Sequence, residues 1–162
     1  FAEIMEDTIY LRNKYFPKSK VSVLSNATML HKPAVFEALK QVDNNILKLD
    51  TVDEAYIRLI DAPVGRYSLP AVIEQMKAFE GHCIIQTMFL KGEYRGVDVN
   101  NTTDKYVLPW LQTIKEIAPS QVMIYTIDRE TPVEGLLKAS HEELDAIAEK
   151  VREAGINVSV SY

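Results

Sequence analysis

Four polar residues stand at the ends of two short apolar runs in this 162-residue chain: Ser25, Asn26, Lys48 and Asp50. A carboxylate accepts hydrogen bonds and an amide both donates and accepts them, so Asp50 and Asn26 suit the hydroxyl groups of a ribose. The ammonium of Lys48 can hold a carboxylate. A simpler interpretation gives Ser25 and Asn26 a role in a turn, and gives Asp50 a role in starting the next helix.

A second set of candidate residues belongs to two later apolar runs and consists of Gln86, Met88, Tyr125, Thr126, Asp128 and Arg129. The amide of Gln86 interrupts an apolar run and needs a partner, which can be a ligand or a neighbouring backbone group. The guanidinium of Arg129 can hold a carboxylate with two parallel hydrogen bonds. Without a ligand, Met88 fills the core, and Asp128 with Arg129 forms an exposed ion pair of little energetic value. Together, the two sets suit an adenosine-like ligand.

The elements that position these residues alternate between strand-like and helix-like patterns. Apolar runs predict strands at 21–24, 45–49, 82–90, 121–126 and 156–161. Helical spacing of apolar residues occurs before and between them, at about 1–15, 33–42, 51–60, 69–79, 108–117 and 140–154. Strands separated by helices pair in parallel, and strands this apolar are typical of sheets covered on both faces. The pattern predicts one α/β domain over residues 1–162, an open sheet or part of a βα barrel, with its site at the carboxyl ends of the strands.

Local signals mark where these elements begin and end. Two Ser/Thr-x-x-Glu patterns, starting at Thr51 and Ser140, predict capping boxes at helix N-termini. Pro109 argues against an uninterrupted helix in its segment. The polar segment 92–103 and the segment 127–139 are predicted to be loops.

Composition excludes several classes of function. The net charge is −5 and no Lys/Arg cluster stands out, which argues against nucleic-acid binding by these residues alone. No apolar run is long enough for a transmembrane helix. The single cysteine, Cys83, excludes an intrachain disulfide and fits a cytoplasmic setting with a buried thiol. The three histidines have no metal-ligand spacing and no phosphate-binding glycine motif occurs, so no metal site is predicted.

The order of several segments resembles the radical S-adenosylmethionine enzymes, and most of all the group of tRNA wyosine-base synthases and their bacterial relatives. The resemblance covers nearly the whole chain. The motifs that carry it are Leu24-Ser25-Asn26-Ala27-Thr28, Leu49-Asp50-Thr51, Asp61-Ala62-Pro63, Phe89-Leu90-Lys91-Gly92 and Tyr125-Thr126-Ile127-Asp128. Each motif alone is weak, and their order and spacing make the match more specific.

The resemblance implies a partial TIM-like (β/α) barrel that binds S-adenosylmethionine beside a four-iron four-sulfur cluster. In that family a 5′-deoxyadenosyl radical abstracts hydrogen from the substrate. By analogy, Asn26 and Asp50 would lie near the ribose and methionine of the cofactor. Gln86, Met88 and Tyr125 would line the adenine and substrate side.

The chain also departs from the family pattern. Lys48 replaces a small polar residue, and Ala27 replaces the usual glycine. The family's Cys-x3-Cys-x2-Cys motif and its Gly-Gly-Glu-like segment are absent, and Cys83 alone cannot ligate a cluster. We therefore expect the C-terminal part of a barrel that lacks its N-terminal βα units. The intact parent would be the enzyme, and this chain alone would be inactive with no cofactor bound.

Two other functions fit the same pattern. The chain could be a non-catalytic α/β binding module with a protein partner, or a segment of an ordinary TIM-barrel or flavodoxin-like enzyme. The sequence does not identify the substrate, and a tRNA base or a protein would both be compatible. An uncovered sheet edge also predicts self-association through that edge.

Overall fold

The computed structural model describes residues 1–129, 131 and 133–162, and its centre is a five-stranded parallel sheet. The strands are hydrogen-bonded in the order β1 (Ser22–Ser25), β2 (Asn44–Lys48), β3 (Ile84–Met88), β6 (Gln121–Tyr125) and β8 (Val158–Ser161). All four strand pairs are parallel. This arrangement confirms the predicted α/β class and its parallel βα-repeat sheet.

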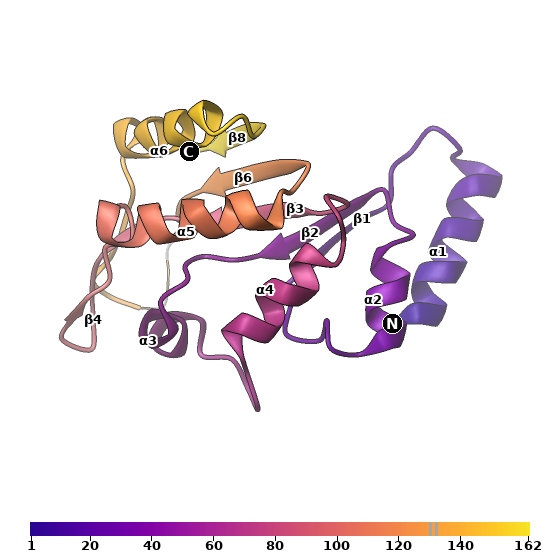
Figure 1. Cartoon of the computed structure of the whole chain (residues 1–162), viewed down its shortest axis with the longest axis horizontal. Coiled ribbons are helices and arrows are strands. Elements are labelled where there is room, and N and C mark those ends of the chain that lie inside the picture. Colours follow the sequence, from indigo (N-terminus) through magenta and orange to yellow (C-terminus); the bar gives the residue numbers. More distant parts are fainter. Residues whose placement is uncertain (130, 132) are drawn as a thin grey trace.

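Helices lie before the first strand and between successive strands of this sheet. They are α1 (Ala2–Tyr15), α2 (Pro33–Leu39), α3 (Glu54–Tyr56), the π-helical turn η1 (Ile57–Asp61), α4 (Leu69–Lys77), α5 (Asp104–Ile117) and α6 (His141–Glu153). Figure 1 shows α4, α5 and α6 following one another along the sheet, while α1 lies against α2 at the other end. None of the helices in the described ranges is both long enough and apolar enough to cross a membrane.

The two faces of the sheet differ in burial, because successive side chains of a strand point to opposite faces. One face carries residues such as Leu47, Ile85 and Val122, which are buried with the helices in the main hydrophobic core. On the other face, the strand register aligns Lys48, Gln86 and Met123, and these side chains are only half-buried. The expectation of a sheet covered on both faces is therefore not met by the described residues. The open face is the surface that a barrel would turn inward.

A small antiparallel sheet at the carboxyl ends of the strands was not predicted. It has the order β5 (Val97–Asp98), β4 (Leu90–Tyr94) and β7 (Leu136–Lys138), all within segments predicted as a single long strand and two loops. The predicted strand 82–90 is divided because the Phe89 amide still donates to the Tyr125 carbonyl at 2.8 Å, whereas the Leu90 amide donates to Asn101 Oδ1 at 2.8 Å. From Leu90 onward the chain leaves the parallel sheet.

The close approach of β4 and β7 depends on Gly92. This glycine has φ +104°, and a Cβ atom there would overlap the carbonyl oxygen of Gly135. We expect Gly92→Ala to lower the free energy of unfolding by about 3 kcal/mol, because the two backbones must separate. Gly96→Ala is the matched control: Gly96 also has positive φ (+75°) but has open space around it, so its cost is about 1 kcal/mol. Urea denaturation measures both variants, and an equal loss in the free energy of unfolding for Gly92→Ala and Gly96→Ala would contradict the steric overlap at Gly92.

Of the three local predictions about helices, the capping box at Ser140 is confirmed, whereas the capping box at Thr51 and the interruption at Pro109 are wrong. Ser140 forms the predicted capping box of α6, accepting from the Glu143 amide at 3.2 Å. The box at Thr51 is wrong, because α3 starts later and Asp53 caps it by accepting from the Tyr56 amide at 2.9 Å. Pro109 lies inside an unbroken α5. This proline is on the exposed side of the helix, where water can satisfy the carbonyl that its missing N–H leaves unpaired.

Candidate functional site

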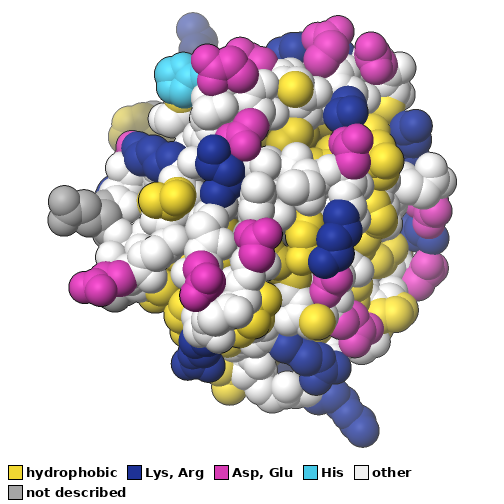
Figure 2. Space-filling view, turned by 90° about the vertical axis from the view of Figure 1, so that its left-hand side faces the viewer, with side chains coloured by type: hydrophobic (Ala, Val, Ile, Leu, Met, Phe, Trp, Pro, Cys, Tyr) yellow, Lys and Arg dark blue, Asp and Glu magenta, His cyan; other side chains and the backbone are white. Residues whose placement is uncertain are grey.

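A cavity of about 430 Å³ opens beside the carboxyl ends of β1 and β2. Figure 2 shows the molecule from the side at which the strands of Figure 1 end, where acidic and basic side chains alternate around exposed apolar atoms. The walls are the turn after β1, the end of β2, the turn η1 and the segment after it. The lining residues are Asn26, Thr28, Met29, Lys48, Leu49, Asp50, Thr51, Ile57, Asp61, Ala62, Pro63, Val64 and Tyr67. Strand-end geometry thus brings the predicted Asn26, Lys48 and Asp50 together.

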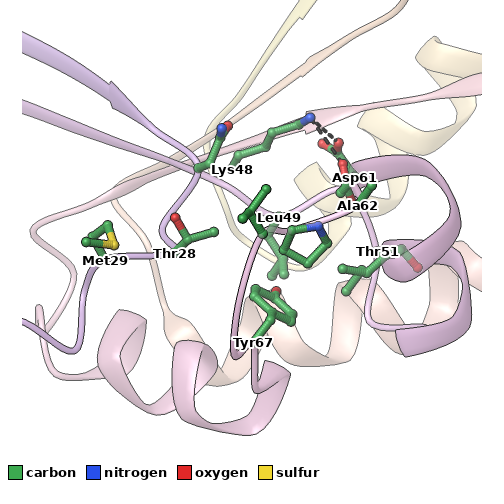
Figure 3. Close-up of a pocket in the computed structure, with 13 residues that line it drawn as sticks. Thr28, Met29, Lys48, Leu49, Thr51, Asp61, Ala62 and Tyr67 are labelled. Atoms are coloured by element: carbon green, nitrogen blue, oxygen red, sulfur yellow. Dashed lines mark hydrogen bonds and ion pairs between the residues drawn. The ribbon is translucent and has the colours of Figure 1, made fainter.

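The polar centre of the cavity is an ion triad of Lys48, Asp50 and Asp61. Lys48 Nζ lies 2.9 Å from Asp50 Oδ2 and 3.2 Å from Asp61 Oδ1. Figure 3 shows Lys48 reaching across the cavity toward Asp61. The Asp50 side chain is only 2% exposed, whereas that of Asp61 is 22% exposed. Asp50 is therefore the interior member of the triad, and Asp61 lies at its solvent side.

The two oxygens of Asp50 have different environments. Oδ1 accepts a hydrogen bond from the Met88 amide at 2.9 Å. Oδ2 has the Lys48 ammonium nearby but accepts no well-directed hydrogen bond from the described residues. Buried polar atoms are normally hydrogen-bonded. Asp50 Oδ2 therefore has capacity to accept a hydrogen bond from a ligand.

Burial and neighbouring charges shift the pKa values of Asp50 and Lys48. Burial raises the pKa of Asp50, and the Asp61 carboxylate adds to this, against the Lys48 ammonium and the Met88 amide. Burial opposes the charge of Lys48, but the Asp50 and Asp61 carboxylates outweigh it and raise the pKa of Lys48. Lys48 therefore keeps its positive charge at neutral pH, while Asp50 is the group whose charge changes with pH.

Three tyrosines, Tyr56, Tyr67 and Tyr125, have pKa values that are raised in part by the carboxylates of the triad. Burial and the Asp61 carboxylate raise the pKa of Tyr67 to about 12. Burial and the Asp50 carboxylate raise the pKa of Tyr56, whose hydroxyl donates to the Val99 carbonyl at 3.2 Å. The pKa of Tyr125 is raised by burial and by Asp50. All three hydroxyls stay protonated near neutral pH, and that of Tyr67, a residue of the cavity wall, is a neutral polar group at the site.

The backbone that carries Asp50 is held from the core side. Trp110 Nε1 donates to the Leu49 carbonyl at 3.2 Å and lies 3.1 Å from Thr87 Oγ1. Thr87 Oγ1 donates to the same Leu49 carbonyl at 2.8 Å. Trp110 and Thr87 are 1% and 0% exposed. Two buried donors therefore fix the carbonyl that immediately precedes Asp50.

Asn101 holds the other side of the same backbone. Its Nδ2 donates to the Met88 carbonyl at 2.9 Å and to the Asp50 carbonyl at 3.5 Å, while its Oδ1 accepts from the Leu90 amide. The residue is fully buried. Asn101 thus joins the end of β2, the end of β3 and the start of β4 at one point. It stands in a segment that was predicted to be only a loop.

The turn after β1 combines the two interpretations considered for Ser25 and Asn26. Ser25 Oγ accepts from the Ala27 amide at 3.1 Å, which is a turn contact. Ala27 has φ +61° and is 1% exposed, a conformation that favours glycine. Asn26 instead lines the cavity. Ser25 therefore shapes the turn, and Asn26 faces the site.

The remaining predicted residues lie away from this cavity. Gln86 lies on the open face of the sheet, and its side chain forms no hydrogen bond within the described ranges. Met88 packs against a second, smaller core cluster. Thr126 Oγ1 accepts from the Ala139 amide at 2.8 Å, a contact that fastens the segment before α6. Asp128 and Arg129 are exposed beyond β6. Their roles in binding stay predictions.

Asp61 and Tyr67 are among the cavity residues that sequence reasoning missed. Asp61 is the last residue of the π-helical turn, and Ala62 follows it with φ +41°. This turn brings Asp61 back to Lys48, thirteen positions earlier in the chain. The dipeptide Ala62-Pro63 indicated only a turn. A π-helical turn has no spacing signal in the sequence, so the contact could not be inferred.

The residues present do not fit an iron–sulfur cluster. The described part of the chain contains no group of three or more His, Cys, Asp or Glu side chains able to hold a metal ion. Cys83 belongs to the main core and is 2% exposed. Burial raises the pKa of its thiol to about 12, and a thiolate is the form that ligates metals.

Comparisons with known proteins address the fold. No family model matches the chain. Two curated proteins named UPF0026 protein, from Helicobacter pylori strains J99 and 26695, are each 26% identical over 128 residues, or 77% of this chain. The match spans only 39% of the length of these relatives.

Three solved structures share the architecture. A domain of pyruvate-formate lyase-activating enzyme from Bacteroides vulgatus matches with TM-score 0.68 and 11% identity, over 99% of this chain and 93% of that one. A radical SAM methyltransferase from Sphaerobacter thermophilus matches with TM-score 0.68 and 16% identity, over 87% and 40%. Streptococcus suis SuiB bound to S-adenosylmethionine matches with TM-score 0.60 and 18% identity, over 90% and 32%. The five-stranded parallel sheet with its small antiparallel sheet therefore resembles the partial barrel of radical S-adenosylmethionine enzymes.

Proposed function

We propose that this chain is the C-terminal part of a radical S-adenosylmethionine enzyme and that its cavity binds S-adenosylmethionine. The observation that carries the proposal is the buried carboxylate of Asp50, a residue of the cavity wall, whose Oδ2 has the Lys48 ammonium 2.9 Å away but no well-directed hydrogen bond from the described residues. A ribose hydroxyl is a donor of the right kind for this oxygen. The likeness in fold to SuiB, which was solved with S-adenosylmethionine, supports the same ligand.

The other walls of the cavity also suit this cofactor. A cavity of about 430 Å³ is in the usual range for small-molecule and cofactor sites, which is about 300–1,000 Å³. Asn26 and Thr28 add polar groups that can donate and accept. Met29, Ile57 and Tyr67 provide apolar surface for the adenine or the methionine chain. A few polar groups on a largely apolar wall are typical of such sites.

The open face of the sheet is the surface we assign to the substrate side. Gln86 and Tyr125 lie on it, and Tyr125 is near enough to the triad for Asp50 to influence its pKa. Asp128 and Arg129 at the end of β6 would extend this side toward solvent. In the complete enzyme, the bound cofactor would supply hydrogen-abstraction chemistry to a substrate on this face. This chain's own residues would position the cofactor and hold the substrate beside it.

The cluster ligands must come from outside this sequence, since Cys83 is its only cysteine. We therefore propose that the enzyme is active only as a longer chain in the cytoplasm. The order of the Leu-Ser-Asn, Leu-Asp-Thr and Leu-Lys-Gly motifs supports the wyosine-base synthase-like group as the nearest relatives. The substrate would then be a tRNA base or a protein. β1 is an edge strand of the sheet, and pairing through this edge with a second copy stays a prediction.

Calorimetric titration of the chain with S-adenosylmethionine tests the proposal. We expect saturable binding at one site and no comparable binding of ATP, which carries phosphates that the acidic triad repels. Asn26→Ala should weaken binding about fivefold, because one hydrogen bond contributes about 1 kcal/mol. Asn13→Ala, an exposed change on α1, is the matched control and should have no effect. Absence of saturable binding to a folded sample would contradict the proposed function.

A further inference from the structure

The charges that line the cavity do not cancel. Its charged lining residues in the described ranges are Lys48, Asp50 and Asp61. One ammonium faces two carboxylates, so the site carries a surplus of one negative charge when all three groups are ionised. A buried or half-buried surplus charge is costly without a counter-charge. The composition of the wall therefore favours a positively charged ligand over a neutral one.

Asp61 is the source of this surplus. Asp50 and Lys48 form the closer and more buried pair, at 2.9 Å, and would neutralise each other without a third group. Asp61 adds its carboxylate at the solvent side of the same ammonium, at 3.2 Å. The π-helical turn and the left-handed Ala62 hold it there. Asp61 thus places a carboxylate at the solvent side of the cavity wall.

We propose that Asp61 is a specificity-determining residue that selects the cationic sulfonium form of the adenosyl ligand over its neutral thioether. The inference rests on the proposed function, because it concerns the ligand of that same cavity. S-adenosylmethionine and S-adenosylhomocysteine share their adenosine, ammonium and carboxylate groups, and they differ by a methyl group and one positive charge. Attraction between unit charges a few ångströms apart is several times stronger at a partly buried site than in water. S-adenosylhomocysteine, whose sulfur is neutral, would lose this attraction and bind less tightly.

The test is a pair of titrations, with S-adenosylmethionine and with S-adenosylhomocysteine, on wild type and on Asp61→Asn. They are carried out at pH 8, because burial raises the pKa of Asp50 and its carboxylate must be ionised. We expect the wild-type chain to bind the sulfonium about tenfold more tightly, which corresponds to ~1.4 kcal/mol. In Asp61→Asn this preference should fall to within about twofold. The thioether affinity should hardly change, since asparagine keeps an acceptor for Lys48.

Glu74→Gln is the matched control. It removes the same charge from an exposed carboxylate on α4 that is paired with Lys77, and it should leave the preference at its wild-type value. Equal affinities of the wild-type chain for the two ligands would overturn the inference and leave the proposed function standing. An undiminished preference in Asp61→Asn would overturn it too. If a folded chain binds neither ligand, the proposed function fails first and the inference falls with it.

Discussion

Replacing Trp110 by alanine is expected to lower the free energy of unfolding by about 3–5 kcal/mol, the usual cost of truncating a large buried aromatic side chain. Trp110 is 1% exposed and packs edge to face on Phe89, with ring centroids 5.4 Å apart. The substitution also removes the donor that holds the Leu49 carbonyl next to Asp50. Denaturation in urea measures the loss.

Two further variants separate packing from hydrogen bonding at this position. Trp110→Phe keeps most of the apolar volume and should cost only about 1–2 kcal/mol, mainly from the lost N–H donor. Leu108→Ala changes an exposed residue of the same helix and should cost less than about 1 kcal/mol. A loss for Trp110→Ala no larger than that for Leu108→Ala would contradict the assigned core position.

Asp50→Asn should weaken binding of S-adenosylmethionine by about ten- to hundredfold at pH 8. Hydrogen bonds that involve a charged group contribute about 1.5–3 kcal/mol, and the substitution removes the charge while it keeps the side-chain shape. An amide oxygen can still accept from the Met88 amide, so the local backbone should be preserved. Calorimetry measures the affinity, and circular dichroism verifies the fold. Wild-type affinity in the variant would exclude Asp50 from the binding site.

The pH dependence of both stability and binding should follow from the raised pKa of Asp50. Above about pH 4, the carboxyl group loses its proton in the unfolded chain before it does so in the folded one. The folded state then binds more protons, so the contribution of Asp50 to stability falls as the pH rises from about 4 toward neutrality. Affinity for a cationic ligand should rise over the same range as the carboxylate forms. Asp50→Asn should remove both effects, and unchanged slopes in the variant would assign them to other groups.

The features of the fold and of the site that could be predicted from the sequence depend on periodicity and on strand ends. Alternating runs gave the five parallel strands, because a buried strand needs apolar residues on the face that packs under helices. The rule that parallel sheets bind ligands at the carboxyl ends of strands then brought Asn26, Lys48 and Asp50 to one place. Nothing beyond local pattern and strand direction was needed for these residues.

The parts that could not be predicted depend on tertiary contacts. β4 leaves the parallel sheet at Leu90 because Asn101, eleven residues later, takes over its amide. Asp61 reaches Lys48 through a π-helical turn. Trp110 fixes the Leu49 carbonyl although the two residues are sixty-one positions apart in sequence. In each of these contacts, the local sequence around one residue contains no pattern that predicts its distant partner.

Hydrogen exchange followed by mass spectrometry, with and without S-adenosylmethionine, tests most directly that the cavity beside β1 and β2 is the cofactor site. We expect slower exchange in the peptides that contain residues 26–29, 48–51 and 61–67, because these segments contain most of the cavity wall. Peptides from α6 should be unchanged and serve as the internal reference. Protection that is confined to other segments, or no protection at saturating ligand, would contradict the central claim.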